Sequence, residues 1–121
     1  MLSMPKLIVI ICILISGTVL ADVPQDQVKE VEHLLEFVKH SNCVIDRNGT
    51  SYPAVQAVDH IEKKYDYFRD DINNTEEFIE YSATKSTMSG KYYTVTCAGE
   101  KTVNTREWLL TELKRFRSGS N

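Results

Sequence analysis

The chain has 121 residues, with 14 basic and 17 acidic side chains and a formal net charge of −3 at pH 7. This length is enough for one small domain with one hydrophobic core. A nucleic-acid-binding domain usually carries a basic field, so the acidic balance argues against that class of protein.

Residues 1–21 have the pattern of a cleavable signal peptide. Lys6 precedes an unbroken apolar run from Leu7 to Ile15, and small side chains at Val19 and Ala21 occupy the positions that a signal peptidase reads. The apolar run is too short to span a bilayer, which takes about 20 apolar residues. We expect cleavage after Ala21, export, a single domain over 22–117, a frayed tail over 118–121, and no transmembrane segment in the mature chain.

Cleavage after Ala21 would remove Cys12 with the predicted signal peptide and leave two cysteines, Cys43 and Cys97. Export implies an oxidising compartment, which favours a disulfide between them. A thiol enzyme would need one of them to be free and activated, and the chain has no Cys-x-x-Cys motif. Closing a loop of about 54 residues stabilises the fold by roughly 4 kcal/mol in the loop-closure model.

The first half of the mature chain predicts a helix and then a hairpin. Over Pro24 to His40, apolar residues recur at three-and-four spacing, which predicts an amphipathic helix. Two β-prone runs, 43–47 and 50–52, then flank Asn48-Gly49. Asn-Gly favours a tight hairpin turn because both central residues need positive φ.

Two more helices are predicted next. Pro53 can begin a helix that runs to about Asp70, since its ring already has helical φ. A shorter helix follows, capped by Asn73, Asn74 or Thr75, with acidic residues in its first turn.

The last part predicts a loop, a strand and a helix. Residues 84–90 are rich in hydroxyls and lack periodicity, and 92–97 alternates as a half-buried strand does. Asn104 to Glu107 has the capping-box form before an apolar helix. The predicted fold is α+β with element order α-β-β-α-α-β-α. A small antiparallel or mixed sheet, made of the hairpin 43–52 and the strand 92–97, is covered by helices, and the disulfide places these strands together.

Ser82-Ala-Thr-Lys85 matches the Ser-x-x-Lys pattern of penicillin-binding enzymes, in which the lysine activates the serine. Those enzymes add Ser-Asp-Asn and Lys-Thr-Gly elements, which this chain lacks. We therefore expect no enzyme. A small serine hydrolase using Ser82 and Lys85, or Ser86, is the least favoured alternative.

The hydroxyl-rich loop also suggests anion binding. Lys85, Ser86, Ser89, Gly90 and Lys91 offer ammonium groups, hydroxyls and backbone N–H groups close together. The first glycine of a P-loop is missing, so a nucleotide site is not predicted. A small-anion or glycan binder at this loop is the second hypothesis, and a solvated loop is the alternative interpretation.

The three histidines do not predict a metal site. Glu30-x-x-His33 has a spacing used by helical di-metal proteins, but such sites need two copies of the motif. We expect neither a metal nor another cofactor. His60, near Asp59 and Lys64 in the second predicted helix, is a candidate for a polar recognition face.

Several short segments share their order and spacing with a known family. They are Arg47-Asn-Gly49; Ala57, His60 and Lys64; Glu77-Phe-Ile79; Ala83 and Ser86; and Gly90-Lys91 with Tyr93 and Val95. On these residues the chain resembles, from about Val31 to Phe116, the YfeK-like family of small exported bacterial proteins of unknown function. The resemblance implies a Gram-negative periplasmic location, an α+β fold and no assigned catalytic residues.

Our first hypothesis is a non-enzymatic periplasmic module that binds a protein partner or an envelope component. The candidate surface residues are Arg47, Asn48, Gly49, His60, Lys64, Ser86, Ser89, Gly90 and Lys91. Because the disulfide would join Cys97 to the hairpin strand, we expect the polar turns at 47–49 and 86–91 to be neighbours on one surface.

Overall fold

The computed structural model describes residues 22–119. The predicted signal peptide, its cleavage site and the last two residues of the predicted tail lie outside the described residues. The elements are α1 (Gln25–Lys39), β1 (Val44–Arg47), β2 (Thr50–Pro53), α2 (Ala54–Tyr67), the 3-10 turn η1 (Arg69–Asp71), α3 (Thr75–Ala83), β3 (Thr94–Thr96), β4 (Val103–Asn104) and α4 (Thr105–Arg117). This confirms the predicted α+β class.

The four strands form one antiparallel sheet in the order β2-β1-β3-β4. Ile45 in β1 pairs with Tyr52 on one side and Val95 on the other. The turn between β1 and β2 has positive φ at Asn48 (54°) and Gly49 (83°), which is the backbone that the Asn-Gly pair predicts.

The third strand is shorter than predicted, and a fourth was not predicted. Within the predicted strand 92–97, only 94–96 form the ladder, and Tyr92 makes an isolated bridge to Lys85. β4 contains two residues, which is too few for an alternation pattern to be visible in the sequence.

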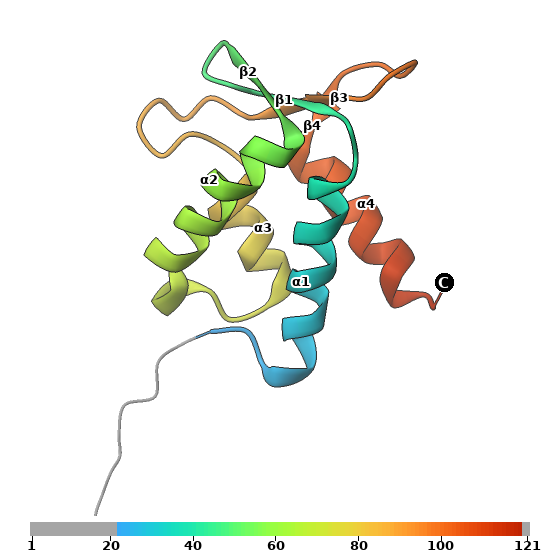
Figure 1. Cartoon of the computed structure of the whole chain (residues 1–121). Helices are drawn as coiled ribbons and strands as arrows, with labels where there is room; N and C mark the ends of the chain where they lie inside the picture. Colours follow the sequence, from blue (N-terminus) through green and yellow to red (C-terminus); the bar gives the residue numbers. More distant parts are fainter. Residues whose placement is uncertain (1–21, 120–121) are drawn as a thin grey trace, which may run out of the picture.

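The sheet lies across one end of the four helices (Figure 1). The core is formed where the helices meet each other and the sheet. Its fully buried large side chains include Leu34 from α1, Ile45 and Val95 from the sheet, and Phe78 from α3. Burying one such side chain contributes about 1.5–3 kcal/mol.

The helix ends differ from the prediction in three places. α2 ends at Tyr67 and not at about Asp70, because the chain tightens into the separate 3-10 turn Arg69–Asp71. Pro53 precedes α2 with ψ of 143° and pairs with Val44, so it ends β2 instead of beginning the helix. The predicted capping box at Asn104 is wrong: its side chain makes no cap hydrogen bond, and Glu107 pairs with Arg106 at 2.7 Å. Asn74 does cap α3, because its Oδ1 accepts a hydrogen bond from the Glu77 N–H at 2.8 Å.

The predicted disulfide between Cys43 and Cys97 is present, with a Cα–Cα distance of 4.3 Å. Cys43 precedes β1 and Cys97 follows β3, so the bridge closes the end of this strand pair opposite the Asn48-Gly49 turn. The pairing of β1 with β3 therefore fixes where the β1–β2 hairpin lies relative to the loop between α3 and β3.

None of the helices within residues 22–119 has the length and apolar content that crossing a membrane requires.

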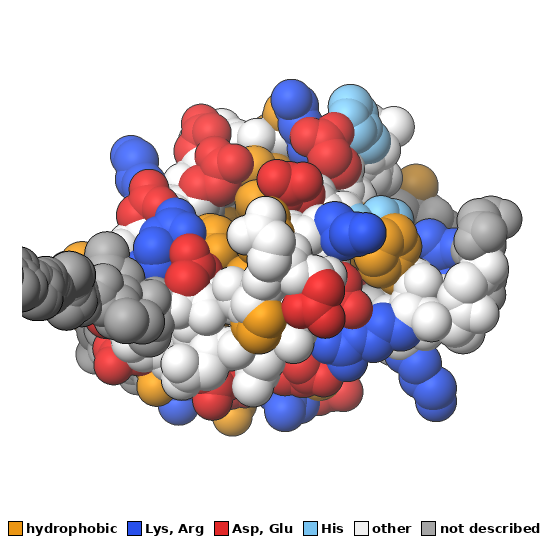
Figure 2. Space-filling model, turned by 90° about the horizontal axis from the view of Figure 1, so that it is seen from below, with side chains coloured by type: hydrophobic (Ala, Val, Ile, Leu, Met, Phe, Trp, Pro, Cys, Tyr) orange, Lys and Arg blue, Asp and Glu red, His pale blue; other side chains and the backbone are white. Residues whose placement is uncertain are grey.

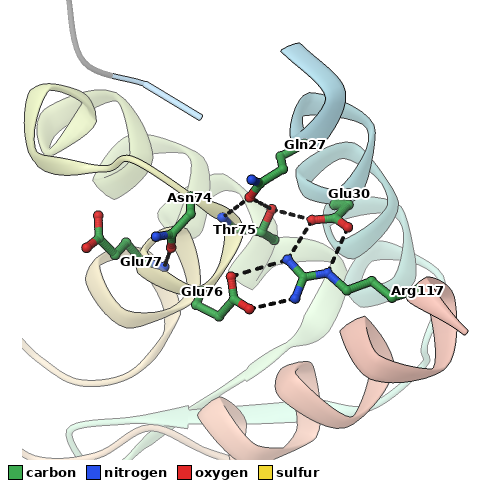
Figure 3. A network of polar contacts seen from close by, with 7 residues as sticks. All are labelled: Gln27, Glu30, Asn74, Thr75, Glu76, Glu77 and Arg117. Carbon is green, nitrogen blue, oxygen red and sulfur yellow. Dashed lines mark hydrogen bonds and ion pairs between the residues drawn. The ribbon is translucent and has the colours of Figure 1, made fainter. Parts of the chain in front are cut away.

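A network of ion pairs joins α1, α3 and α4 away from the sheet (Figure 3). Arg117 donates from Nε to Glu30 at 2.8 Å and from another guanidinium nitrogen to Glu76 at 2.6 Å. Thr75 donates from its hydroxyl to Glu30 at 2.6 Å. The guanidinium lowers the pKa of both carboxyl groups, chiefly through these hydrogen bonds.

Candidate functional site

A hollow of about 600 Å³ opens between the β1–β2 hairpin, α2 and the loop before β3. We call it the hairpin pocket. Its ionisable and other polar lining residues include Arg47, Asn48, His60, Lys63, Lys64 and Ser86. The volume lies within the range of about 300–1,000 Å³ that ligand pockets have.

The two polar turns predicted from the sequence are neighbours. The loop between α3 and β3 runs beside the hairpin (Figure 1), and Ser89 donates from Oγ to Asn48 Oδ1 at 2.6 Å. This hydrogen bond joins residues that are 41 positions apart in the chain. The predicted adjacency of the turns is therefore confirmed.

Five of the nine candidate surface residues line the pocket: Arg47, Asn48, His60, Lys64 and Ser86. The other four, Gly49, Ser89, Gly90 and Lys91, do not. Gly90 instead borders a smaller hollow of about 300 Å³, which Ser86 also lines. The structure thus divides the predicted surface into a pocket group and a group on the two turns.

Arg47 has no carboxylate partner among the described residues. Its guanidinium carbon lies 4.4 Å from the centroid of the Tyr52 ring, and its Nε is buried without a hydrogen bond. Each of the other four arginines, all within residues 22–119, forms an ion pair with a carboxylate. Arg47 is therefore the one arginine of the described chain whose charge is balanced by no acidic side chain.

Lys64 is a second uncompensated cation. Its side chain is 9% exposed, and its ammonium group donates to the backbone oxygen of Lys85 at 2.7 Å. That oxygen is neutral, so it satisfies a donor without cancelling the charge. Burial, followed by the charge of Arg47, lowers the pKa of Lys64.

His60 and Tyr93 contribute polar atoms without charge. His60 Nε2 lies 3.2 Å from the Tyr93 hydroxyl. Burial, then the charges of Arg47, Lys64 and Lys63, lower the pKa of His60 to about 4. Burial also raises the pKa of Tyr93, so both groups are neutral at pH 7.

The electrostatic balance of the pocket is positive. None of the described residues that line it is Asp or Glu, whereas Arg47, Lys63 and Lys64 are basic. Asp59 borders a separate, smaller hollow next to Arg47 and His60, but it forms no ion pair with a described residue. A chain with a net negative charge therefore carries a local excess of positive charge here.

The loop from Ser86 to Lys91 uses its own polar groups to hold its shape. The N–H groups of Ser86 and Gly90 donate to loop carbonyls at 2.9 Å. Those of Ser89 and Lys91 donate to the hydroxyls of Ser86 and Ser89. These four N–H groups are already bonded, so an anion at this loop would have to be held by side chains.

The proposed serine–lysine pair is not assembled. Ser82 is fully buried, and its hydroxyl has no hydrogen-bond partner among the described residues. Lys85 is exposed, with its ammonium group 5.9 Å from the centroid of the Tyr92 ring. Lys85 therefore does not act as a base toward Ser82 in this arrangement.

The apolar half of the pocket was missed by the sequence analysis. Its lining residues include Tyr52, Tyr67, Phe68, Met88 and Tyr93. Tyr67 and Met88 lie at the rim and are 81% and 97% exposed. The sequence held two signals: Tyr93, which is among the residues that carry the family resemblance, and Met88, a single large apolar residue within a loop of serines, threonines and lysines.

The other two histidines have acidic partners on the helices. His33 Nε2 lies 2.6 Å from a Glu112 oxygen, and His40 Nε2 lies 3.0 Å from a Glu36 oxygen. Within the described part of the chain, no group of three or more His, Cys, Asp or Glu side chains could hold a metal ion.

Comparison with known proteins places the chain in a family. No curated protein and no solved structure matches it. The model of a family of unknown function, DUF5329, matches residues 25–117, from the first residue of α1 to the last of α4. Since this match spans the whole described fold, the chain belongs to the DUF5329 family of unknown function.

Proposed function

We propose that the protein is a non-enzymatic binding module that acts in the periplasm, with the hairpin pocket as its docking surface. The signal-peptide pattern of residues 1–21 and the retained cysteine pair support export. The resemblance to the YfeK-like family, whose members are small exported bacterial proteins, supports the same location. The partner is a protein or another component of the cell envelope.

One observation carries the assignment of the surface: half-buried Arg47 and buried Lys64, two cations without acidic partners among the described residues, border the same hollow. A buried charge without a counter-charge lowers stability, and a well-packed apolar residue would avoid that cost. Groups with perturbed pKa values, such as Lys64, are found more often at functional sites than elsewhere. A docked partner that supplies negative charge would compensate Arg47 and Lys64 together.

Site-specific photocrosslinking in intact cells tests this function. A photoreactive residue in place of Met88 lies at the rim of the pocket, and one in place of Val55 lies on α2 outside it. Val55 is 57% exposed, so it is accessible to a partner and serves as the control. We expect a discrete adduct from position 88 and none from position 55.

The same experiment includes a charge variant. Lys64→Met keeps most of the buried aliphatic side chain and removes its charge, so it should abolish the adduct at position 88. Adducts of equal strength from both positions, or an adduct that is insensitive to Lys64→Met, would remove the pocket from the proposed function.

A second candidate function is binding of a small anion or glycan at the hydroxyl-rich loop. It is favoured by the smaller hollow that Lys85, Ser86 and Gly90 line together; Glu80 also lines this hollow, but its carboxylate is paired with Arg106. Because the loop N–H groups are bonded internally, this function depends on lysine side chains. It therefore predicts that Lys85→Gln abolishes binding while Arg47→Gln leaves it intact, the reverse of what the hairpin pocket requires.

A further inference from the structure

We propose that the hairpin pocket binds an organic oxyanion, a carboxylate or a phosphate ester, that carries an apolar group at least the size of a phenyl ring. This inference rests on the proposed function, because it names the chemistry that the docking surface recognises.

The charge of the pocket selects an anion. Arg47 and Lys64 face a hollow to which no described acidic side chain contributes. The guanidinium of Arg47 donates no hydrogen bond to a described residue, and its carbon lies over the Tyr52 ring, 4.4 Å from the centroid. A planar guanidinium with free donors matches the two oxygens of a carboxylate or phosphate.

The uncharged polar groups can orient such an oxyanion. The Tyr93 hydroxyl and His60 Nε2 are 3.2 Å apart, and both residues line the pocket with Ser86. These groups offer hydrogen bonds without changing the charge of the site. Lys64 also lies 5.3 Å from the centroid of the Tyr93 ring, so cation and hydroxyl border one space.

The apolar half of the pocket shows that a bare ion is too small. The hollow measures about 600 Å³, whereas one water molecule occupies about 30 Å³. An inorganic phosphate would leave most of this space empty beside Tyr52 and Phe68. Rim residues Tyr67 and Met88 expose large apolar surfaces to water, and such surfaces commonly mark binding sites.

Matched small probes can test this inference on the mature, disulfide-bonded chain. Benzoate and phenyl phosphate carry the two oxyanions on one ring, benzamide keeps the shape without the charge, and inorganic phosphate keeps the charge without the ring. Binding is followed by NMR shifts of the pocket amides and by calorimetry. Fragments of this size bind in roughly the millimolar range.

We expect benzoate or phenyl phosphate to bind at least about tenfold more tightly than both benzamide and inorganic phosphate, since hydrogen bonds between charged groups are the strong ones. The tighter of the two aryl anions identifies the head group. Arg47→Gln should weaken binding about tenfold, and Arg47→Lys should weaken it less. Lys91→Gln, at an exposed residue outside the pocket, is the control and should have no effect.

Three results would overturn the inference: equal binding of benzamide, equal binding of inorganic phosphate, or no shift of pocket amides with any probe. Circular dichroism of each variant separates loss of binding from loss of folding. If no probe binds while the adduct at position 88 still depends on Lys64, the ligand class is wrong and the docking surface stands. If aryl anions bind but no adduct forms, the anion site stands and the docking function fails.

Discussion

Arg117 and Arg47 occupy opposite electrostatic situations in one small fold. Arg117 lies between Glu30 and Glu76 where three helices meet (Figure 3), and acidic and basic side chains are interspersed over that end of the molecule (Figure 2). Arg47 lies against Tyr52 beside a hollow, without a described carboxylate partner. The described residues thus supply counter-charges for Arg117 and none in the hairpin pocket. This contrast distinguishes a cation that holds helices together from one that is available to a ligand.

The largest expected effect concerns the disulfide, which supports the pocket side of this comparison. Replacing both Cys43 and Cys97 by serine should lower the free energy of unfolding by about 2–4 kcal/mol, because the unfolded chain gains freedom. Urea unfolding measures this loss. Hydrogen exchange should rise more in β1 and β3 than in α1 and α4. Reducing agent should not affect the serine variant, and unchanged stability after reduction of the native chain would contradict the prediction.

The two regions should respond to acid over different pH ranges. The pKa of His60 falls from 6.5 to about 4 on folding, so the unfolded chain binds the proton more tightly. Above pH 6.5, His60 is neutral in both states and its titration costs no stability. As the pH falls toward 4, the unfolded chain takes up a proton that the folded chain does not, so the free energy of unfolding decreases. After allowance for partial exposure to solvent, the loss is about 2 kcal/mol.

The carboxyl groups of the arginine network respond at lower pH. Folding lowers the pKa of Glu30 and Glu76 from 4.5, so their contribution is lost only as the pH falls below that value. Urea unfolding at a series of pH values should therefore show a loss between pH 6.5 and 4.5 that His60→Gln removes and Glu30→Gln leaves in place. An unchanged slope in His60→Gln would show that another group titrates there.

Removing the charge of each arginine compares the two regions directly. Arg117→Met should lower the free energy of unfolding by about 1 kcal/mol, since its partly exposed ion pairs are weakened by solvent. Arg47→Met should leave stability unchanged or raise it slightly, because it removes an uncompensated charge and keeps an apolar side chain against Tyr52. Equal losses in the two variants, measured by urea unfolding, would abolish the distinction.

The smallest expected effect is a change in the pKa of His60. Arg47→Gln should raise that pKa by a few tenths of a unit, and Lys63→Gln should raise it by less, because Arg47 is the stronger source of positive potential. The titration of the His60 ring protons by NMR reports both values. Lys91→Gln serves as the control, and a larger response to Lys63→Gln than to Arg47→Gln would contradict this order.

The parts of the structure that sequence predicts well are local or have few alternatives. Asn48-Gly49 specifies its turn through backbone preference alone, and Cys97 is the one other cysteine among the described residues with which Cys43 could pair. The adjacency of the two polar turns follows from the disulfide and the strand register. These features need no knowledge of how the helices pack.

The other parts depend on packing over long distances in the chain. Glu30 and Arg117 are 87 residues apart, so no spacing rule links them. The lack of a counter-charge at Arg47 becomes visible only when every neighbouring side chain is placed. Tyr52, Phe68 and Met88 line the pocket together only because the hairpin, the end of α2 and the loop converge. The candidate polar residues were thus predictable, whereas the apolar half of their pocket was not.

The two outer strands also determine how the sheet can meet other chains. β2 has four residues and ends at Pro53, which has no N–H to offer, and β4 has two residues. Short edges of this kind give another strand little backbone to pair with, which protects a sheet from self-association. Strand addition at either edge should therefore be unfavourable, and recognition by a partner should depend on side chains.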